Sequence, residues 1–130
     1  ELGDTDLMDN YVTFFASVFR SIRFGVSSAH GRANLVRFNF FAENDAFERD
    51  PDSGTYRVDF DAMREAMTTL SNRILTLQGD GDREGAAAMW ERMGLMGAGL
   101  EAALDRLAAR DIPVDIVYRQ GPDVLGIESE

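Results

Sequence analysis

The sequence predicts a mostly α-helical fold of about five helices packed antiparallel, with one small β-hairpin at residues 46–58 and an extended C-terminal tail. Apolar residues recur at helical spacing in five stretches, and the connections between these stretches are short, as between antiparallel neighbours. One dense turn signal interrupts the helical pattern. A chain of 130 residues can bury one hydrophobic core, so we expect residues 1–130 to form a single domain or a fragment of one.

The first predicted helix covers residues 9–24, where polar side chains lie opposite a wide apolar stripe. Asp9 or Asn10 can cap its start, and Gly25 suits the position after its end. The stripe consists of Tyr11, Phe15, Val18 and Ile22, widened by Phe14 and Phe19.

The second predicted helix follows Ser27 or Ser28, either of which can accept a hydrogen bond from the first helical turn, and runs to about Glu43. It is apolar around most of its circumference, so we expect it to be central in the fold. One stripe contains Ala29, Ala33, Val36 and Phe40, and further apolar surface comes from Leu35, Phe38 and Phe41.

A hairpin is predicted next, because the run from Asp50 to Gly54 is rich in turn-forming residues and has apolar or aromatic residues on both sides. The third helix follows, with Asp59 or Asp61 as its cap and Gly79 at its end. Its apolar residues repeat at steps of four and three: Met63, Met67, Leu70, Ile74 and Leu77.

Two more helices and a tail complete the prediction. Asp82 caps the fourth helix, which continues to Gly94, and residues 111–113 stop the fifth. The segment 114–130 contains two further turn signals and must lie on another surface to be ordered. The apolar sides of these two helices are formed by Ala86, Met89, Trp90 and Met93, and by Leu100, Ala103, Leu104 and Leu107.

The composition excludes several kinds of chemistry. The chain has no cysteine, so it forms neither a disulfide nor a thiolate site, and all 13 basic residues are arginine, which removes lysine-based catalysis but keeps bidentate binding of carboxylates or phosphates. The net charge of −10 makes nucleic acids and anionic membranes poor partners. No stretch is apolar over the roughly 20 residues of a membrane span, and the N-terminus lacks the basic start of a signal peptide, so we expect a cytoplasmic protein.

Residues 80–91 match the spacing of a calcium-binding loop, with oxygen ligands at Asp80, Asp82 and Glu84, glycine at the sixth position and Glu91 at the twelfth. The second half of this run favours helix where a calcium loop needs irregular backbone, so we interpret the match as a turn between helices, capped by Asp82. One histidine and no cysteine cannot supply the ligands of a zinc site, and we expect no metal site in this chain.

His30 is the only histidine, and it lies in the first turn of the second predicted helix. At helical spacing it shares a face with Asn34, Arg37 and Phe41, so three hydrogen-bonding side chains follow one another along an otherwise apolar helix. We expect this face to be functional, with His30 facing a cleft as a hydrogen-bond donor. The spacing alone favours a partly buried histidine that is bonded to the backbone.

Two enrichments mark the first third of the chain. Seven of the nine phenylalanines precede residue 42, and their helical spacing favours core packing over a ligand groove. Four arginines surround His30 and form either a carboxylate-binding patch or a set of internal ion pairs: Arg20, Arg23, Arg32 and Arg37.

Several short motifs match a known enzyme family in their order and spacing. Arg23-Phe24-Gly25, Ala29-His30-Gly31 and Ala33-Asn34 are followed by an aromatic-rich helix and a hairpin, and then by Leu75, Gly79-Asp80, Gly85-Ala86 and Met93-Gly94. Over about residues 11–120 this arrangement resembles the C-terminal part of the dipeptidyl peptidase III family. It most resembles bacterial and plant members, some of which carry an N-terminal Nudix domain.

The resemblance implies that the chain is part of the helical catalytic lobe of a two-lobed zinc exopeptidase. The family's HExxxH motif and its second glutamate-bearing motif lie upstream and are absent here, so zinc is expected in the full-length parent and no cofactor in this chain. By the resemblance, His30 hydrogen-bonds the substrate carbonyl. The family often has an arginine where this chain has Asn34, and the candidate substrate-binding residues are Asn34, Arg32 and Arg37.

We therefore expect the C-terminal portion of a bacterial dipeptidyl peptidase III-like zinc metallohydrolase, inactive alone. Its expected partners are a peptide or small-molecule substrate and the rest of the parent catalytic lobe, and we allow for a homo-oligomer. The alternative is a non-catalytic helical interaction or regulatory module that binds through the Phe-rich first third. An HExxxH motif upstream in the natural gene would favour the enzyme interpretation over the binding module.

Overall fold

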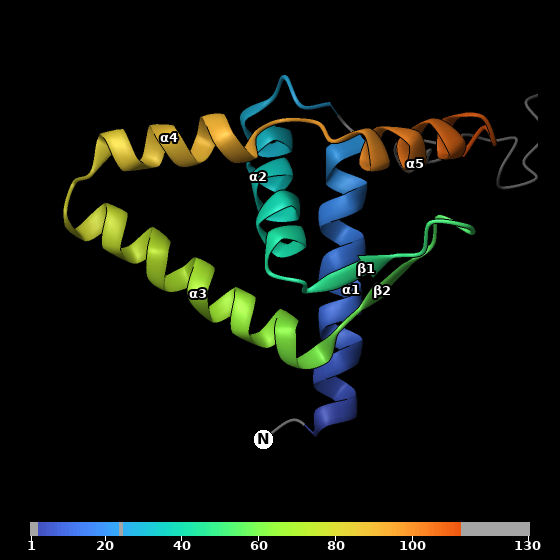
Figure 1. Ribbon diagram of the computed structural model, residues 1–130, viewed down its shortest axis with the longest axis horizontal. Coiled ribbons are helices and arrows are strands. Elements are labelled where there is room, and N and C mark those ends of the chain that lie inside the picture. The colour runs from blue at the N-terminus through green and yellow to red at the C-terminus, as the bar shows by residue number, and fades with distance from the viewer. Residues whose placement is uncertain (1–2, 24, 113–130) are drawn as a thin grey trace, which may run out of the picture.

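The computed structural model describes residues 3–23 and 25–112 of the chain (Figure 1). Within these ranges it contains five helices and a two-stranded antiparallel sheet, so the predicted fold class is confirmed. The predicted tail at 114–130 lies outside the described residues. In chain order the elements are α1 (Asp4–Arg23), α2 (Ala29–Glu43), β1 (Phe47–Arg49), β2 (Tyr56–Val58), α3 (Phe60–Gly79), α4 (Arg83–Met93) and α5 (Ala98–Ala108).

Helix α1 runs antiparallel to α2, and the two form the central pair of the fold (Figure 1). The predicted start of α1 at Asp9 or Asn10 is wrong, because the helix begins at Asp4. Asp4 and Asp6 in its first turn interact favourably with the positive end of the helix dipole. The added turns contain few buried apolar side chains, so the periodicity does not reveal them. The predicted stripe is buried at Phe15, Val18 and Ile22.

Helix α2 occupies the centre, as predicted. It stands between α1 and the pair formed by α3 and α4, and β1 packs near its C-terminal end (Figure 1). Phe38, Phe40 and Phe41 are all buried, although they point in different directions around the helix. The C-terminal half of α2 is therefore enclosed by apolar contacts, whereas side chains of its N-terminal half reach the surface.

The corner between α1 and α2 depends on two glycines. Gly25 has a φ of +104°, which glycine adopts without the strain that a Cβ atom would bring. Gly31 is buried in the first turn of α2, and a Cβ atom there would overlap with the backbone carbonyl of Gly25. This close backbone contact fixes where α2 begins, and with it the position of the neighbouring His30.

We expect Gly31→Ala to lower the free energy of unfolding by about 1–3 kcal/mol, because the overlap with the Gly25 carbonyl forces the backbone to shift. In an unobstructed helix the same change would instead stabilise by about 0.5–1 kcal/mol. Gly79→Ala is the matched control, since no atom lies within 4 Å of its added Cβ atom. Urea denaturation of both variants checks the prediction, and equal effects at the two sites would contradict it.

The predicted hairpin forms at the expected place. The carboxylate of Asp50 accepts hydrogen bonds from the backbone N–H groups of Ser53 at 2.7 Å and Asp52 at 2.9 Å. These bonds, those from Ser53 above all, lower the pKa of Asp50 below its ordinary value. Arg106 of α5 donates to the backbone carbonyls of Ser53 and Gly54 at 2.7 and 2.8 Å. The strand register pairs Phe47 with Val58, Glu48 with Arg57, and Arg49 with Tyr56.

An aromatic cluster joins the hairpin to the helix pair. The ring of Phe47 lies 4.5 Å from that of Phe15 on α1, 4.8 Å from that of Phe38 on α2, and 5.7 Å from that of Tyr56 on β2, measured between centroids. Tilted and edge-on aromatic pairs of this kind stabilise a core beyond their buried area. The phenylalanine enrichment thus serves core packing, as the spacing predicts.

Helices α3 and α4 form an arm that diverges from the core. The two helices meet at the turn 80–82 (Figure 1). The predicted stripe of α3 is buried at Met63 and Leu70, but Ile74 is 39% exposed, because the distal half of the helix extends beyond α2. Asp82 caps α4, as predicted, by accepting from the N–H of Gly85 at 2.8 Å. The described residues of this arm thus leave an apolar face partly uncovered.

Candidate functional site

The N-terminal half of α2 carries the predicted site. Ser28 is its N-cap, and the Ser28 hydroxyl accepts from the N–H of Gly31 at 3.0 Å, as the sequence predicts. His30 lies in the first turn and is exposed, and its side chain has no hydrogen-bond partner among the described residues. The alternative of a partly buried histidine bonded to the backbone does not describe this structure.

Helical geometry places Asn34 and Arg37 on the same face as His30, as predicted. Arg37 is exposed, Asn34 is half-buried, and Nη1 of Arg37 donates to Oδ1 of Asn34 at 2.9 Å. Phe41, which continues the face, is buried against Phe14 of α1. We call His30, Asn34 and Arg37 the α2 face, and it ends where the apolar core begins.

Arg32 does not belong to the α2 face. Two residues after His30, it points to the other side of the helix, where its guanidinium carbon lies 5.1 Å from the ring centroid of Trp90 on α4. A guanidinium in this position is attracted to the aromatic ring and covers its face. The structure therefore separates Arg32 from the other candidate substrate-binding residues.

A cavity of about 290 Å³ lies between α2, α3 and α4, beside the α2 face. Arg37 is the one charged residue that lines it, and Gln78 is the one uncharged polar residue. The apolar residues lining the cavity are Ala33, Val36, Leu70, Ile74, Leu77, Ala86, Met89 and Trp90. We call it the α2–α3–α4 cavity. His30 stands outside it, and Arg37 connects the two features.

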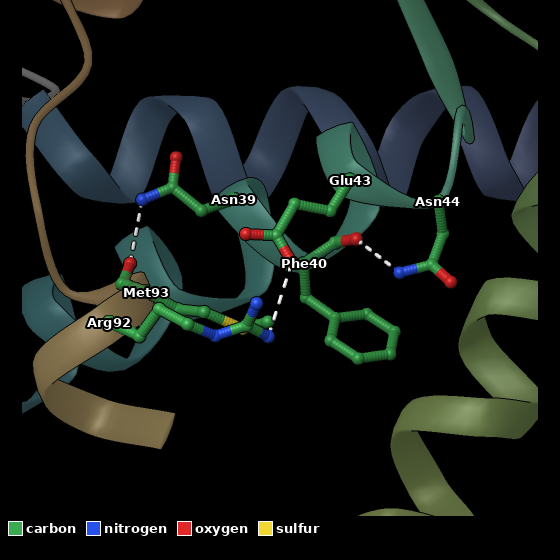
Figure 2. A network of polar contacts seen from close by, with 6 residues as sticks. All are labelled: Asn39, Phe40, Glu43, Asn44, Arg92 and Met93. Carbon is green, nitrogen blue, oxygen red and sulfur yellow. Dashed lines mark hydrogen bonds and ion pairs between the residues drawn. The ribbon is translucent and has the colours of Figure 1, made fainter. Parts of the chain in front are cut away.

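Polar contacts hold α2 against the end of α4 (Figure 2). The side-chain amide of Asn39 donates to the backbone carbonyls of Met93 at 2.6 Å and Leu95 at 2.8 Å. Glu43 and Arg92 form an exposed ion pair at 3.2 Å, which contributes little on its own. Asn39 fixes the start of the loop between α4 and α5. The sequence gives little sign of this role, because its only signal is an amide side chain within an apolar helix.

The described residues do not fit a zinc site. Within residues 3–23 and 25–112, no three His, Cys, Asp or Glu side chains gather closely enough to hold a metal ion. The calcium-loop match at 80–91 is instead a turn that leads into α4, with regular helix from Arg83 onward. Any metal that acts with His30 must therefore be held by residues beyond those described.

Across the described part of the chain, no helix combines the length and the apolar character needed to cross a bilayer.

The chain is similar in sequence to part of a known plant protein. No protein-family model matches it. A curated relative, Nudix hydrolase 3 from Arabidopsis thaliana, is 42% identical over 106 residues, which are 82% of this chain but 14% of the relative. The chain thus corresponds to a small part of that plant protein.

Two solved structures share the fold. Dipeptidyl peptidase III from Caldithrix abyssi matches with a TM-score of 0.76 and 37% identity, and covers 82% of this chain and 20% of that one. The dipeptidyl peptidase III from Corallococcus sp. strain EGB matches with a TM-score of 0.75 and 38% identity over 84% of this chain and 20% of its own. The chain spans one-fifth or less of the length of these relatives.

The fold is thus that of a helical region found within these two dipeptidyl peptidase III structures. The chain is similar to part of dipeptidyl peptidase III, and the resemblance predicted from its motifs is confirmed. The Nudix name of the plant relative agrees with the predicted link between such regions and Nudix proteins.

Proposed function

We propose that the chain is part of the catalytic lobe of a dipeptidyl peptidase III-like zinc hydrolase and contributes His30 to the substrate site. One observation carries the proposal. In a region with this fold, His30 is exposed and leaves both ring nitrogens without a partner among the described residues. These ring nitrogens are therefore accessible to a ligand, as a hydrogen-bond donor in a substrate site must be.

In this role the imidazole N–H of His30 donates a hydrogen bond to the carbonyl oxygen of the scissile peptide bond. Negative charge develops on that oxygen as the carbonyl carbon becomes tetrahedral, so the hydrogen bond strengthens in the transition state. The cap of Ser28 and the contact of Gly31 with Gly25 hold the first turn of α2, which fixes the backbone position of His30. The described residues provide no zinc site, so the proposal assigns the metal to segments outside them.

The alternative function, a non-catalytic module, has less support. It needs the Phe-rich first third as a binding surface, but Phe15, Phe38, Phe40 and Phe41 are buried within the core. The exposed residues of this region are mostly polar and lie on or next to α1 and α2.

The proposal predicts a difference between the isolated chain and the complete protein. We expect the complete protein to release dipeptides from peptide substrates and to lose this activity when a chelator removes zinc, with recovery when zinc is restored. The isolated chain should hydrolyse none of these peptides and hold no stoichiometric zinc, because one histidine and scattered carboxylates cannot bind the metal.

Elemental analysis and a peptidase assay on both proteins test this prediction. An inactive complete protein with bound zinc would favour the non-catalytic module. One tightly bound zinc per isolated chain would contradict the assignment of the metal to other segments.

A further inference from the structure

The side of α1 that faces away from α2 is apolar along much of its length, and the described residues cover it only in part. Val12 is 47% exposed, Ala16 is exposed, and Met8 and Phe19 are half-buried on the same side of the helix. These four residues line a groove of about 720 Å³, whose other wall is formed by β2 and Leu107 of α5. We call these four residues the outer α1 face. Apolar residues at this spacing form the stripe by which one helix packs against another.

The charges of α1 divide by sign along the helix. Exposed carboxylates, Asp6 and Asp9 among them, lie in its first turns, which extend past β2 and α3 (Figure 1). Arg20 and Arg23 lie in its last turn, and both line the groove together with Arg57 of β2. Among the described residues, no carboxylate lines this groove. The surface that complements α1 is therefore an apolar stripe with the opposite order of charges.

We propose that the outer α1 face binds the same face of a second copy of this chain, as an antiparallel pair of α1 helices related by a two-fold axis. In such a pair, residues equally far from the axis along the sequence lie opposite each other. Three complementary pairs have their midpoint at Phe14 or directly beside it: Met8 with Phe19, Val12 with Ala16, and Asp9 with Arg20. The apolar stripe and the charges of α1 thus agree on one position of the axis.

The pair of Asp9 and Arg20 determines the relative direction of the two helices. At 3.6 residues per turn, these two residues project within about 20° of each other, on one flank of the outer α1 face. The same flanks meet in an antiparallel pair, so Asp9 of each copy lies beside Arg20 of the other. In a parallel pair, like charges would meet at both positions, which is unfavourable.

Both groups are able to form this contact. Asp9 is exposed and forms no ion pair with another described residue. Arg20 is exposed and has five N–H donors, so it can bind the carboxylate in addition to its existing contacts. Ala16 is small, which lets the two helix axes approach closely at the centre of the pair.

Sedimentation velocity of the 130-residue chain tests the inference. At about 0.15 M salt, screening reduces the repulsion between two chains of net charge −10, but affects adjacent charges much less. We expect a dimer whose fraction rises with protein concentration. Asp9→Arg and Arg20→Asp should each raise the dimer Kd at least about tenfold, because like charges then meet twice in the interface. An equal mixture of the two variants should restore the original Kd, because opposite charges meet again at both positions.

Glu65→Arg is the matched control, because it makes the same change of charge at an exposed residue of α3 that does not line the groove, and it should leave the Kd unchanged. Val12→Asp should abolish the dimer by placing a carboxylate in the apolar stripe, whereas Leu75→Asp, at a leucine of α3 that is 65% exposed, should not. Circular dichroism verifies that each variant keeps its helices.

A monomer at every concentration would overturn the inference, whether residues 113–130 or another part of the complete protein then covers the outer α1 face. A dimer whose Kd is unchanged by Asp9→Arg and Val12→Asp would also overturn it, because its interface would lie elsewhere. If Arg20→Asp does not fold, these two variants decide the question without it. The outcome is independent of the function proposed for His30.

Discussion

Alanine in place of His30 is expected to lower kcat of the complete protein roughly 10²- to 10³-fold, the effect of removing one oxyanion donor, with little change in KM. The loss falls on kcat because the hydrogen bond is stronger in the transition state than in the bound substrate. Steady-state kinetics with one peptide substrate measure both constants. Since the side chain is exposed and unbonded among the described residues, the free energy of unfolding should stay within about 0.5 kcal/mol.

Two further variants test whether the N–H donor at position 30 is the group that raises kcat. His30→Gln retains an N–H donor and should recover part of the lost turnover, whereas Ser27→Ala changes an exposed residue just before α2 and should behave like the original protein. If His30→Ala raises KM and leaves kcat intact, the residue only binds substrate, and its assignment to the transition state is wrong.

Phe41→Ala is expected to lower the free energy of unfolding by about 3–5 kcal/mol. Phe41 is 1% exposed, and its ring packs edge-on against Phe14 at 5.9 Å between centroids, where α1 and α2 meet. Alanine would lose this contact and leave a cavity that the helix pair cannot close. Urea denaturation of the isolated chain measures the loss, which should appear in the midpoint of the transition.

Leu75→Ala on α3 is the control, because Leu75 is 65% exposed and its truncation should cost less than about 0.5 kcal/mol. If Phe41→Ala does not fold, Phe41→Leu should still unfold with a loss of about 1–2 kcal/mol. Equal stabilities for the variants at Phe41 and Leu75 would mean that α2 is not the centre of the core.

The parts of the fold that could be predicted depend on local signals. Ser28, Asp59 and Asp82 each cap a helix where the sequence places a cap, because capping needs only a short polar side chain and the N–H groups three residues later. The start of α1 at Asp4 could not be predicted, because only a weak local signal marks it. Its first turns are stabilised by acidic side chains near the helix end, and this signal is weaker than an apolar stripe.

The candidate site could be predicted in part. The spacing of seven residues is enough to put His30 and Arg37 on one helix face, and the structure keeps them there. The partner of Arg32 could not be derived, because it depends on how α4 crosses α2 and brings Trp90 to that side. The same holds for Asn39, whose acceptors Met93 and Leu95 are more than 50 residues away in the chain.

The two hydrogen bonds from Arg106 to the hairpin turn also affect how the chain folds. They join segments 52 and 53 residues apart, so closing this loop costs more chain entropy than pairing α1 with α2. Contacts between neighbours in sequence are therefore expected to form first and the contact of α5 with the turn later. Because Ser53 and Gly54 are bound in this way, loosening of α5 also loosens the hairpin. The last helix and the only sheet of the described residues thus gain or lose their order together, as one cooperative element.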